Sequence, residues 1–170
     1  MAPRPLQARD LACLLAVQRA CYGDGFIEGA DVYARRLASP AQCSWVLERE
    51  GGGVCAYLAA YRSVRGKVTP LHGDFDAGPQ EAPAADTLYL HDLAVLPAFT
   101  GQGLAQALLQ ALWAQARADG LAHSALVAVQ GSQRFWERHG YAAQPLACGI
   151  QRQRLAAYGA DAQYMARPLL

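Results

Sequence analysis

Two glycines, Gly101 and Gly103, follow an apolar stretch that ends at Pro97 and precede a long run with helical periodicity. Glycine has no Cβ, so its backbone can adopt a positive φ and approach a ligand closely. Successive amide groups at the start of a helix bind anions, aided by the positive end of the helix dipole. Ala105 keeps the first helical turn small. These residues predict a site at which backbone amides hold a phosphate-bearing ligand without a lysine or an arginine.

Other known motifs do not fit this stretch. The dinucleotide fingerprint requires a glycine at position 106, where this chain has Gln106. The Gly-Lys-Ser/Thr run of a P-loop is absent, and so are HExxH and GxSxG. On spacing alone, a purely structural turn before a core helix remains an alternative to ligand binding.

The composition is that of one globular domain. The chain has 170 residues, of which 53% are apolar and 17% charged, and its net charge is +1. We therefore expect a single domain over residues 1–170 and no nucleic-acid partner. No apolar stretch approaches the roughly 20 residues of a membrane span. The five dispersed cysteines favour neither a disulfide framework nor a zinc site. We expect a cytoplasmic protein with no metal and no membrane contact.

The glycine turn lies within an alternating series of strands and helices. Apolar periodicity and turn residues predict strands at Pro5-Leu6, 43–49, 54–62, 87–96, 123–129, 141–147 and 162–168. They predict helices at Arg9–Cys21 (capped by Asp10), Ala30–Ala38, 102–118 and 132–139. Residues 63–86 predict a long irregular connection, either functional or a mobile surface loop. This order predicts an α/β domain with a mixed sheet.

The segment LHDLAVLPAFTGQGLAQALL resembles motif A of the GNAT superfamily of N-acetyltransferases, and SQRFWERHGY resembles its motif B. The resemblance covers residues 85–147, and the first half of the chain agrees only in the order of its elements. It implies a GNAT fold of the α/β (α+β) class. In this fold a mixed, mostly antiparallel sheet of about seven strands is flanked by about four helices and splayed between strands 4 and 5. The implied acetyl-CoA-binding core spans residues 87–147.

The co-substrate implied by the resemblance is acetyl-CoA. Backbone groups of Leu93, Ala94 and Val95 would bind the pantetheine and thioester, with the Val95 N–H as oxyanion donor. The residues that would hold the pyrophosphate, or lie beside it, are Thr100, Gly101, Gln102, Gly103, Leu104, Ala105 and Gln106. Those that would approach the pantetheine arm are Ser132, Phe135 and Trp136.

The chain departs from the family pattern at two positions. Thr100 replaces the usual arginine or glutamine, which removes one side-chain contribution and leaves the backbone amides in place. Trp136 stands where many members carry a tyrosine that protonates the departing thiolate. An indole N–H donates a hydrogen bond but supplies no proton, so we interpret Trp136 as a packing residue.

Acetyl transfer to an amine requires a base for the ammonium proton, and we consider Tyr89, His91 and Asp92. An imidazole suits this role, although a purely structural histidine is an alternative. The segment YLHDLAV also resembles the arylalkylamine N-acetyltransferases, which carry two histidines on this strand. His91 matches the second histidine, and Tyr89 takes the place of the first. Strand alternation places Asp92 on the opposite face from these two residues, unless the β-bulge implied by the family intervenes.

We expect a small-molecule amine as the acceptor, with specificity set by residues 22–40, 63–86 and the closing hairpin. A protein lysine or N-terminus is the alternative acceptor. A non-catalytic acyl-CoA-binding module is a further alternative, which Trp136 and Thr100 favour. A homodimer is compatible with the resemblance.

Overall fold

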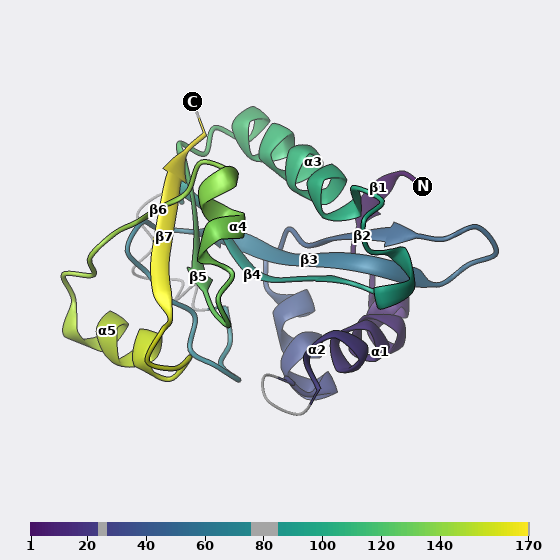
Figure 1. Cartoon of the computed structure of the whole chain (residues 1–170), viewed down its shortest axis with the longest axis horizontal. Helices are drawn as coiled ribbons and strands as arrows, with labels where there is room; N and C mark the ends of the chain where they lie inside the picture. Colours follow the sequence, from purple (N-terminus) through teal and green to yellow (C-terminus); the bar gives the residue numbers. More distant parts are fainter. Residues whose placement is uncertain (24–26, 76–84, 170) are drawn as a thin grey trace.

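A seven-stranded mixed sheet with the order β1-β2-β3-β4-β5-β7-β6 forms the centre of the molecule (Figure 1). The computed structural model describes residues 1–23, 27–75 and 85–169. The strands are β1 Pro3–Pro5, β2 Trp45–Glu48, β3 Val54–Ser63, β4 Thr87–Val95, β5 His123–Ala128, β6 Ala142–Ala143 and β7 Gln163–Pro168. The helices of the described residues are α1 Leu11–Tyr22, α2 Ala30–Ala38, α3 Leu104–Ala118, α4 Gln133–Arg138 and α5 Gly149–Ala156. Short 3-10 turns occur at Ala8–Asp10 and Pro97–Phe99.

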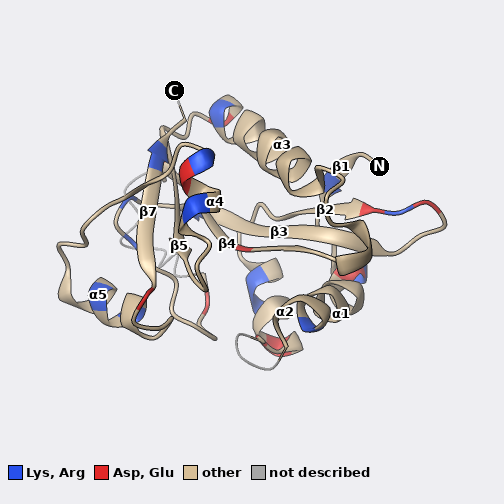
Figure 2. Cartoon of the chain, in the orientation of Figure 1, with Lys and Arg blue, Asp and Glu red and all other residues tan. Residues whose placement is uncertain are grey.

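Helices cover both faces of the sheet. Leu108 and Leu112 of α3 are buried in the core cluster under one face. Leu14 and Val17 of α1 are buried in a separate cluster under the other face. Figure 1 shows α3 on one side of β3 and β4, and α1 with α2 on the other side. Most charged residues lie on helices, turns and strand ends (Figure 2), so the central strands are free to form the apolar core.

The sheet splays between β4 and β5. These two strands are parallel and pair only over Thr87–Leu90 with His123–Leu126. Beyond that point β5 continues to pair with β7, whereas β4 continues to pair with β3. Figure 1 shows β7 running across the direction of β3. The expected GNAT fold, with its mixed sheet and its splay between strands 4 and 5, is confirmed.

A β-bulge interrupts β4 at His91. Leu90 pairs with Ala60 and Asp92 with Ala59, so His91 is the extra residue. Leu90 packs in the core cluster under α3, whereas the Asp92 carboxylate bonds to tyrosines of the opposite face. Strict alternation of side chains, which would place Asp92 and His91 on opposite faces, is therefore wrong for this strand. The bulge implied by the family is present. A bulge re-aims the side chains that follow it.

Helix α5 was not expected from the sequence. The predicted closing strand over 141–147 is only two residues long in the structure, Ala142–Ala143, and α5 follows it. None of the eight residues of α5 is buried, so its sequence lacks the apolar periodicity that identifies a helix. Leu155 packs, partly buried, against a core cluster, and polar contacts also hold the helix, including a hydrogen bond from the Val68 N–H to Gln151 Oε1 (2.8 Å).

The described part of the connection after β3 is anchored to this end of the molecule. The Gly66 N–H donates to the Tyr164 hydroxyl (2.8 Å), and the Tyr158 hydroxyl donates to the Thr69 carbonyl (2.7 Å). Residues 76–84 of the predicted connection lie outside the described residues. The anchored segment 66–75 lies next to the site discussed below.

Asp10 does not cap α1. Its carboxylate accepts hydrogen bonds from Arg4 (2.7 Å) and from the Gln7 N–H (2.9 Å), which closes the 3-10 turn that precedes the helix. The five cysteines are all free thiols. No helix of the described residues is long and apolar enough to cross a bilayer.

Candidate active site

The glycine turn has the backbone conformation that its sequence predicts. Gly101 and Gly103 have φ values of 77° and 75°, and α3 begins directly after them. The turn borders a cavity of about 280 Å³. The predicted residues that line this cavity are Val95, Thr100, Gly101, Gly103, Leu104, Ala105, Gln106 and Phe135. Gln102 is not part of the lining. The amides at the start of α3 therefore lie beside a space that could hold an anion.

A second cavity, of about 380 Å³, lies in the splay between β4 and β5. It shares Val95, Ala105 and Phe135 with the first, so the two cavities adjoin, and together they are called the cleft below. The predicted site residues that line this second cavity are His91, Asp92, Leu93, Val95, Ala105, Ser132, Phe135 and Trp136. Gln130, Val127, Val129 and Leu71 add to its walls.

The edge of β4 that faces this cavity carries backbone donors. The Leu96 N–H donates to the Cys55 carbonyl on β3 (2.8 Å). Backbone groups alternate in direction along a strand, so the N–H groups of Leu93 and Val95 point away from β3. The carbonyls of the same two residues accept bonds from the Tyr22 hydroxyl (2.8 Å) and the Cys21 thiol (3.2 Å). The N–H groups are thus left for a ligand in the cleft, which fits an acyl-pantetheine arm.

Two of the predicted site residues face away from the cleft. Ala94 is buried in the cluster beneath α1, and its backbone groups face β3, where it pairs with Tyr57, so the expected backbone contact of Ala94 with the pantetheine is wrong. Tyr89 is fully buried, and its ring packs on Tyr61 with 5.1 Å between centroids. Burial raises the pKa of the Tyr89 hydroxyl above its usual range. Tyr89 lines neither cavity, so it is poorly placed to act as a base.

Trp136 is packed rather than free. Its indole lies edge-on to Phe135 and Tyr141, with 4.9 Å and 5.5 Å between ring centroids. The nearby Ser132 hydroxyl accepts a hydrogen bond from the Val129 N–H (3.2 Å). These contacts fix one wall of the cleft and agree with the packing interpretation of Trp136.

His91 is held by a carboxylate that the sequence did not reveal. Its Nε2 lies 2.6 Å from Glu28 Oε1, and both side chains are almost completely buried. Burial alone would raise the pKa of Glu28, but His91 and Arg36 outweigh it, so the pKa lies well below its usual value. An ionised carboxylate only accepts hydrogen bonds. Nε2 must therefore carry a proton, and in the neutral ring the lone pair is on Nδ1.

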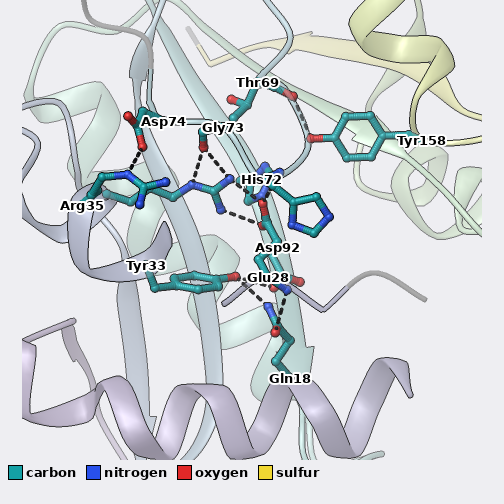
Figure 3. A network of polar contacts seen from close by, with 12 residues as sticks. Gln18, Glu28, Tyr33, Arg35, Thr69, His72, Gly73, Asp74, Asp92 and Tyr158 are labelled. Atoms are coloured by element: carbon teal, nitrogen blue, oxygen red, sulfur yellow. Dashed lines mark hydrogen bonds and ion pairs between the residues drawn. The ribbon is translucent and has the colours of Figure 1, made fainter. Parts of the chain in front are cut away.

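Glu28 is itself held from the opposite side by Arg36. The two Arg36 terminal nitrogens lie 2.6 Å and 2.5 Å from the Glu28 carboxylate oxygens. Arg36 also donates to the Gly73 carbonyl, and the His72 N–H donates to Glu28 (2.9 Å). Figure 3 shows Glu28 at the centre of this network. The network ties α2 and the segment after β3 to the histidine on β4.

Asp92 is surrounded by tyrosine hydroxyls. Oδ1 accepts from Tyr22 (2.7 Å), and Oδ2 accepts from Tyr33 (2.9 Å) and Tyr57. Burial and the neighbouring Asp92 charge raise the pKa of all three hydroxyls, so they stay protonated donors. Gln18 bonds to both Tyr33 and the Glu28 N–H, and so connects the two carboxylate networks (Figure 3).

Sequence reasoning missed Tyr22, Glu28 and Tyr158 as lining residues of the second cavity. Glu28 lies 63 positions before His91, and no local motif joins them. Tyr22 and Glu28 do fall within residues 22–40, and Tyr158 within the closing hairpin, which were both expected to contribute to acceptor specificity. In the described part of the chain, no group of three or more His, Cys, Asp or Glu is arranged to hold a metal ion.

The model of the acetyltransferase (GNAT) family matches residues 12–141. The chain belongs to the GNAT family. Its fold matches that of the ribosomal-protein-S18-alanine N-acetyltransferase from Escherichia coli with a TM-score of 0.70. The sequences are 17% identical, and the match covers 99% of this chain and 93% of that chain. A comparison with curated proteins gives no match.

Two further solved structures carry acyl-CoA ligands in this fold. GphF, a GNAT-like decarboxylase in complex with isobutyryl-CoA, matches with a TM-score of 0.74 and 18% identity over 100% of both chains. A GNAT family acetyltransferase from Brucella melitensis in complex with acetyl-CoA matches with a TM-score of 0.61 and 21% identity. That match covers 83% of this chain and 82% of the other. At these identities the likeness shows a shared GNAT fold.

Proposed function

We propose that this protein is an acetyl-CoA-dependent N-acetyltransferase that acetylates a primary amine of a small molecule by direct attack in a ternary complex. The observation that carries the proposal is the meeting of two cavities in one cleft. The cavity at the glycine turn suits the phosphates, and the cavity in the splay contains a buried histidine. Family membership and the acyl-CoA complexes of similar folds support the acyl donor.

The residues of this chain fit an acetyl-CoA molecule along the cleft. Amides at the turn of Gly101 and Gly103 would hold the pyrophosphate. The N–H groups of Leu93 and Val95 would bind the pantetheine and the thioester carbonyl. Acetyl-CoA supplies an acyl group that its thioester already activates. The protein therefore mainly positions the reactants and removes a proton, which can supply several kcal/mol of the barrier.

His91 is the base in this proposal, acting through Nδ1. It takes one proton from the substrate ammonium, and Glu28 stabilises the imidazolium that results. The amine nitrogen then bonds to the acetyl carbon while the Val95 N–H stabilises the oxyanion. The C–S bond breaks, and the second proton of the nitrogen leaves with the thiolate sulfur. This route needs no proton from Trp136, which has none to give.

The charges in the cleft favour acyl transfer over decarboxylation. A decarboxylase must bind the carboxylate of its substrate, and a cation usually does this. The described lining of the second cavity contains neither lysine nor arginine. It contains Asp92, whose carboxylate has no cationic partner among the described residues and suits an ammonium group.

The test is CoA release from acetyl-CoA with a panel of small amines, lysine peptides and peptide N-termini. We expect turnover with small amines and a fall in kcat/KM of about 100-fold or more in His91→Gln, with unchanged CoA affinity. The rise of kcat/KM with pH should also flatten. His123→Gln is the matched control, because His123 lies on β5 outside both cavities.

Three results would contradict the proposal. An unchanged pH profile in His91→Gln removes this residue as the base. Turnover of peptides alone moves the acceptor to a protein. Tight CoA binding without turnover on any acceptor indicates a non-catalytic acyl-CoA-binding module.

A further inference from the structure

The second cavity holds an unusual balance of charge. Its described lining contains two carboxylates, Glu28 and Asp92, and one imidazole, His91. The other lining residues are apolar or carry neutral polar groups. A buried carboxylate that no cation neutralises disfavours the binding of a second anion. The cations near Glu28 and Asp92 therefore decide whether the cavity accepts an anionic substrate.

The charge of Glu28 is already neutralised. Arg36 is 1% exposed, and its guanidinium donors bond to the two Glu28 oxygens and to the Gly73 carbonyl. Tyr33 and Phe75 lie against the guanidinium at 5.5 Å and 5.2 Å from their ring centroids. Arg36 therefore makes four hydrogen bonds within this network and does not line the cavity. It offers nothing to an anionic substrate.

The charge of Asp92 is not neutralised by any cation of the described residues. Its partners are three neutral hydroxyls, from Tyr22, Tyr33 and Tyr57. A carboxylate has about four acceptor sites, two on each oxygen. Oδ2 accepts two hydrogen bonds and Oδ1 accepts one, so Oδ1 keeps one site. Asp92 thus lines the cavity with a negative charge and a vacant acceptor position.

The segments outside the described residues cannot reverse this balance. Residues 24–26 and 76–84 contain no lysine or arginine in the sequence. Leu71, Val127 and Val129 line the same cavity as Asp92 and His91, and these apolar side chains favour an apolar substituent. An ammonium on an apolar chain matches this site in charge and in polarity.

We propose that the acceptor is a monoamine with an apolar substituent and no carboxylate beside its amino group, and that Asp92 excludes α-amino acids. This inference rests on the proposed N-acetyltransferase function and adds the class of its acceptor. The ammonium binds at Asp92 Oδ1 next to His91, which removes the proton. A carboxylate on the same carbon would lie close to Asp92 with no cation to accept it, and the two negative charges would repel each other.

The experiment compares acceptors that differ only in the group beside the amine. One series is phenethylamine, phenylalaninamide and phenylalanine, and a second is 3-methylbutylamine, leucinamide and leucine. The amides keep the bulk of the carboxylate without its charge. We expect kcat/KM, measured by CoA release, to be about 100-fold lower for the amino acid than for the amine and the amide.

A substitution of Asp92 tests whether this residue causes the discrimination between amines and α-amino acids. In Asp92→Asn we expect the amine-to-amino-acid ratio of kcat/KM to fall to within about tenfold, whatever the change in absolute rate. Asp119→Asn is the matched control. Its carboxylate pairs with Arg62 (2.7 Å) away from both cavities, so the ratio should not change.

The outcomes separate this inference from the function on which it rests. Equal use of phenylalanine and phenethylamine, or a ratio that survives in Asp92→Asn, overturns the role of Asp92 and leaves the acetyltransferase function standing. Lower activity for both the amide and the amino acid shows selection by size and also overturns it. Absence of turnover for these six acceptors, with turnover of another amine of the panel above, overturns the inference alone. Absence of turnover for the whole panel overturns the proposed function as well.

Discussion

The two cavities of the cleft are built from different parts of the chain. The cavity at the glycine turn is lined mainly by one continuous stretch, from Val95 to Gln106, and its donors are backbone amides. The polar end of the second cavity is built from side chains of α1, α2, β3 and β4 and from the segment before α2. One cavity therefore depends on local backbone conformation, and the other depends on long-range packing.

This difference indicates how each region tolerates change. A side-chain substitution at the turn leaves the amides in place unless it disturbs the backbone. A substitution in the network of Glu28 and Asp92 leaves buried charges or hydroxyls without partners, which costs folding free energy as well as activity. Three substitutions sharpen the comparison, taken in order of decreasing effect.

Glu28→Gln should have the largest effect on stability. It leaves the Arg36 guanidinium buried without a counter-ion, and we expect the free energy of unfolding to fall by about 4 kcal/mol at pH 7. The pKa of Glu28 is lowered in the folded state from an ordinary value of about 4.5. Its contribution is therefore complete above that value and is lost as the pH falls below it.

Urea denaturation of both proteins at pH 7 and at pH 4 measures this effect, and the difference between them should be smaller at pH 4. Glu48→Gln is the control, because its carboxylate is 43% exposed and pairs with Arg4 at the surface. That variant should lose less than about 1 kcal/mol. Equal stability of Glu28→Gln and the wild type at pH 7 would show that the network contributes little.

Gly103→Val should weaken CoA binding by about 30-fold. Gly103 has a φ of 75°, which a β-branched residue resists, so the turn must shift and at least one charge-assisted hydrogen bond is lost. Gly120→Val is the matched control. Gly120 follows α3 with a φ of 80° and lies outside both cavities. Calorimetric titration should show similar losses of stability in the two variants and a loss of affinity only in Gly103→Val.

Thr100→Ala should have the smallest effect, a change in CoA affinity of less than about twofold. The Thr100 hydroxyl is exposed and donates only to the Pro97 carbonyl (2.8 Å), so its loss leaves the amides of the turn in place. A tenfold loss of affinity in the same titration would mean that the side chain, and not only the backbone, binds the phosphates.

The contrast between the two regions also explains what the sequence could predict. The strand, glycine turn and helix of residues 87–118 are local, and their pattern identified the fold and predicted the conformation of the glycine turn. Helix α2 was also predicted with its observed bounds, Ala30–Ala38. Helix α5 was missed because it buries none of its residues completely, and a partly buried leucine, Leu155, together with polar contacts holds it in place.

The residues that line the second cavity could be predicted only in part. His91 and Asp92 were recognised as candidates, but the choice of face depended on a bulge, and a bulge is a property of the pairing with β3. Glu28 was not recognised, because its proximity to His91 exists only after α1 and α2 pack on the sheet. Nothing in the types of neighbouring residues distinguishes it from a surface glutamate. The catalytic roles of these residues remain predictions.

The segment after β3 contacts Glu28 through the His72 N–H, and it contacts Arg36 through the Gly73 carbonyl and the Phe75 ring. The side chain of the preceding residue, Leu71, therefore takes no part in holding His91, although it lines the cavity. This separation makes position 71 a natural place to retune the enzyme for larger or smaller acceptors. A library of apolar residues there would vary the shape of the cavity while His91 keeps its contact with Glu28.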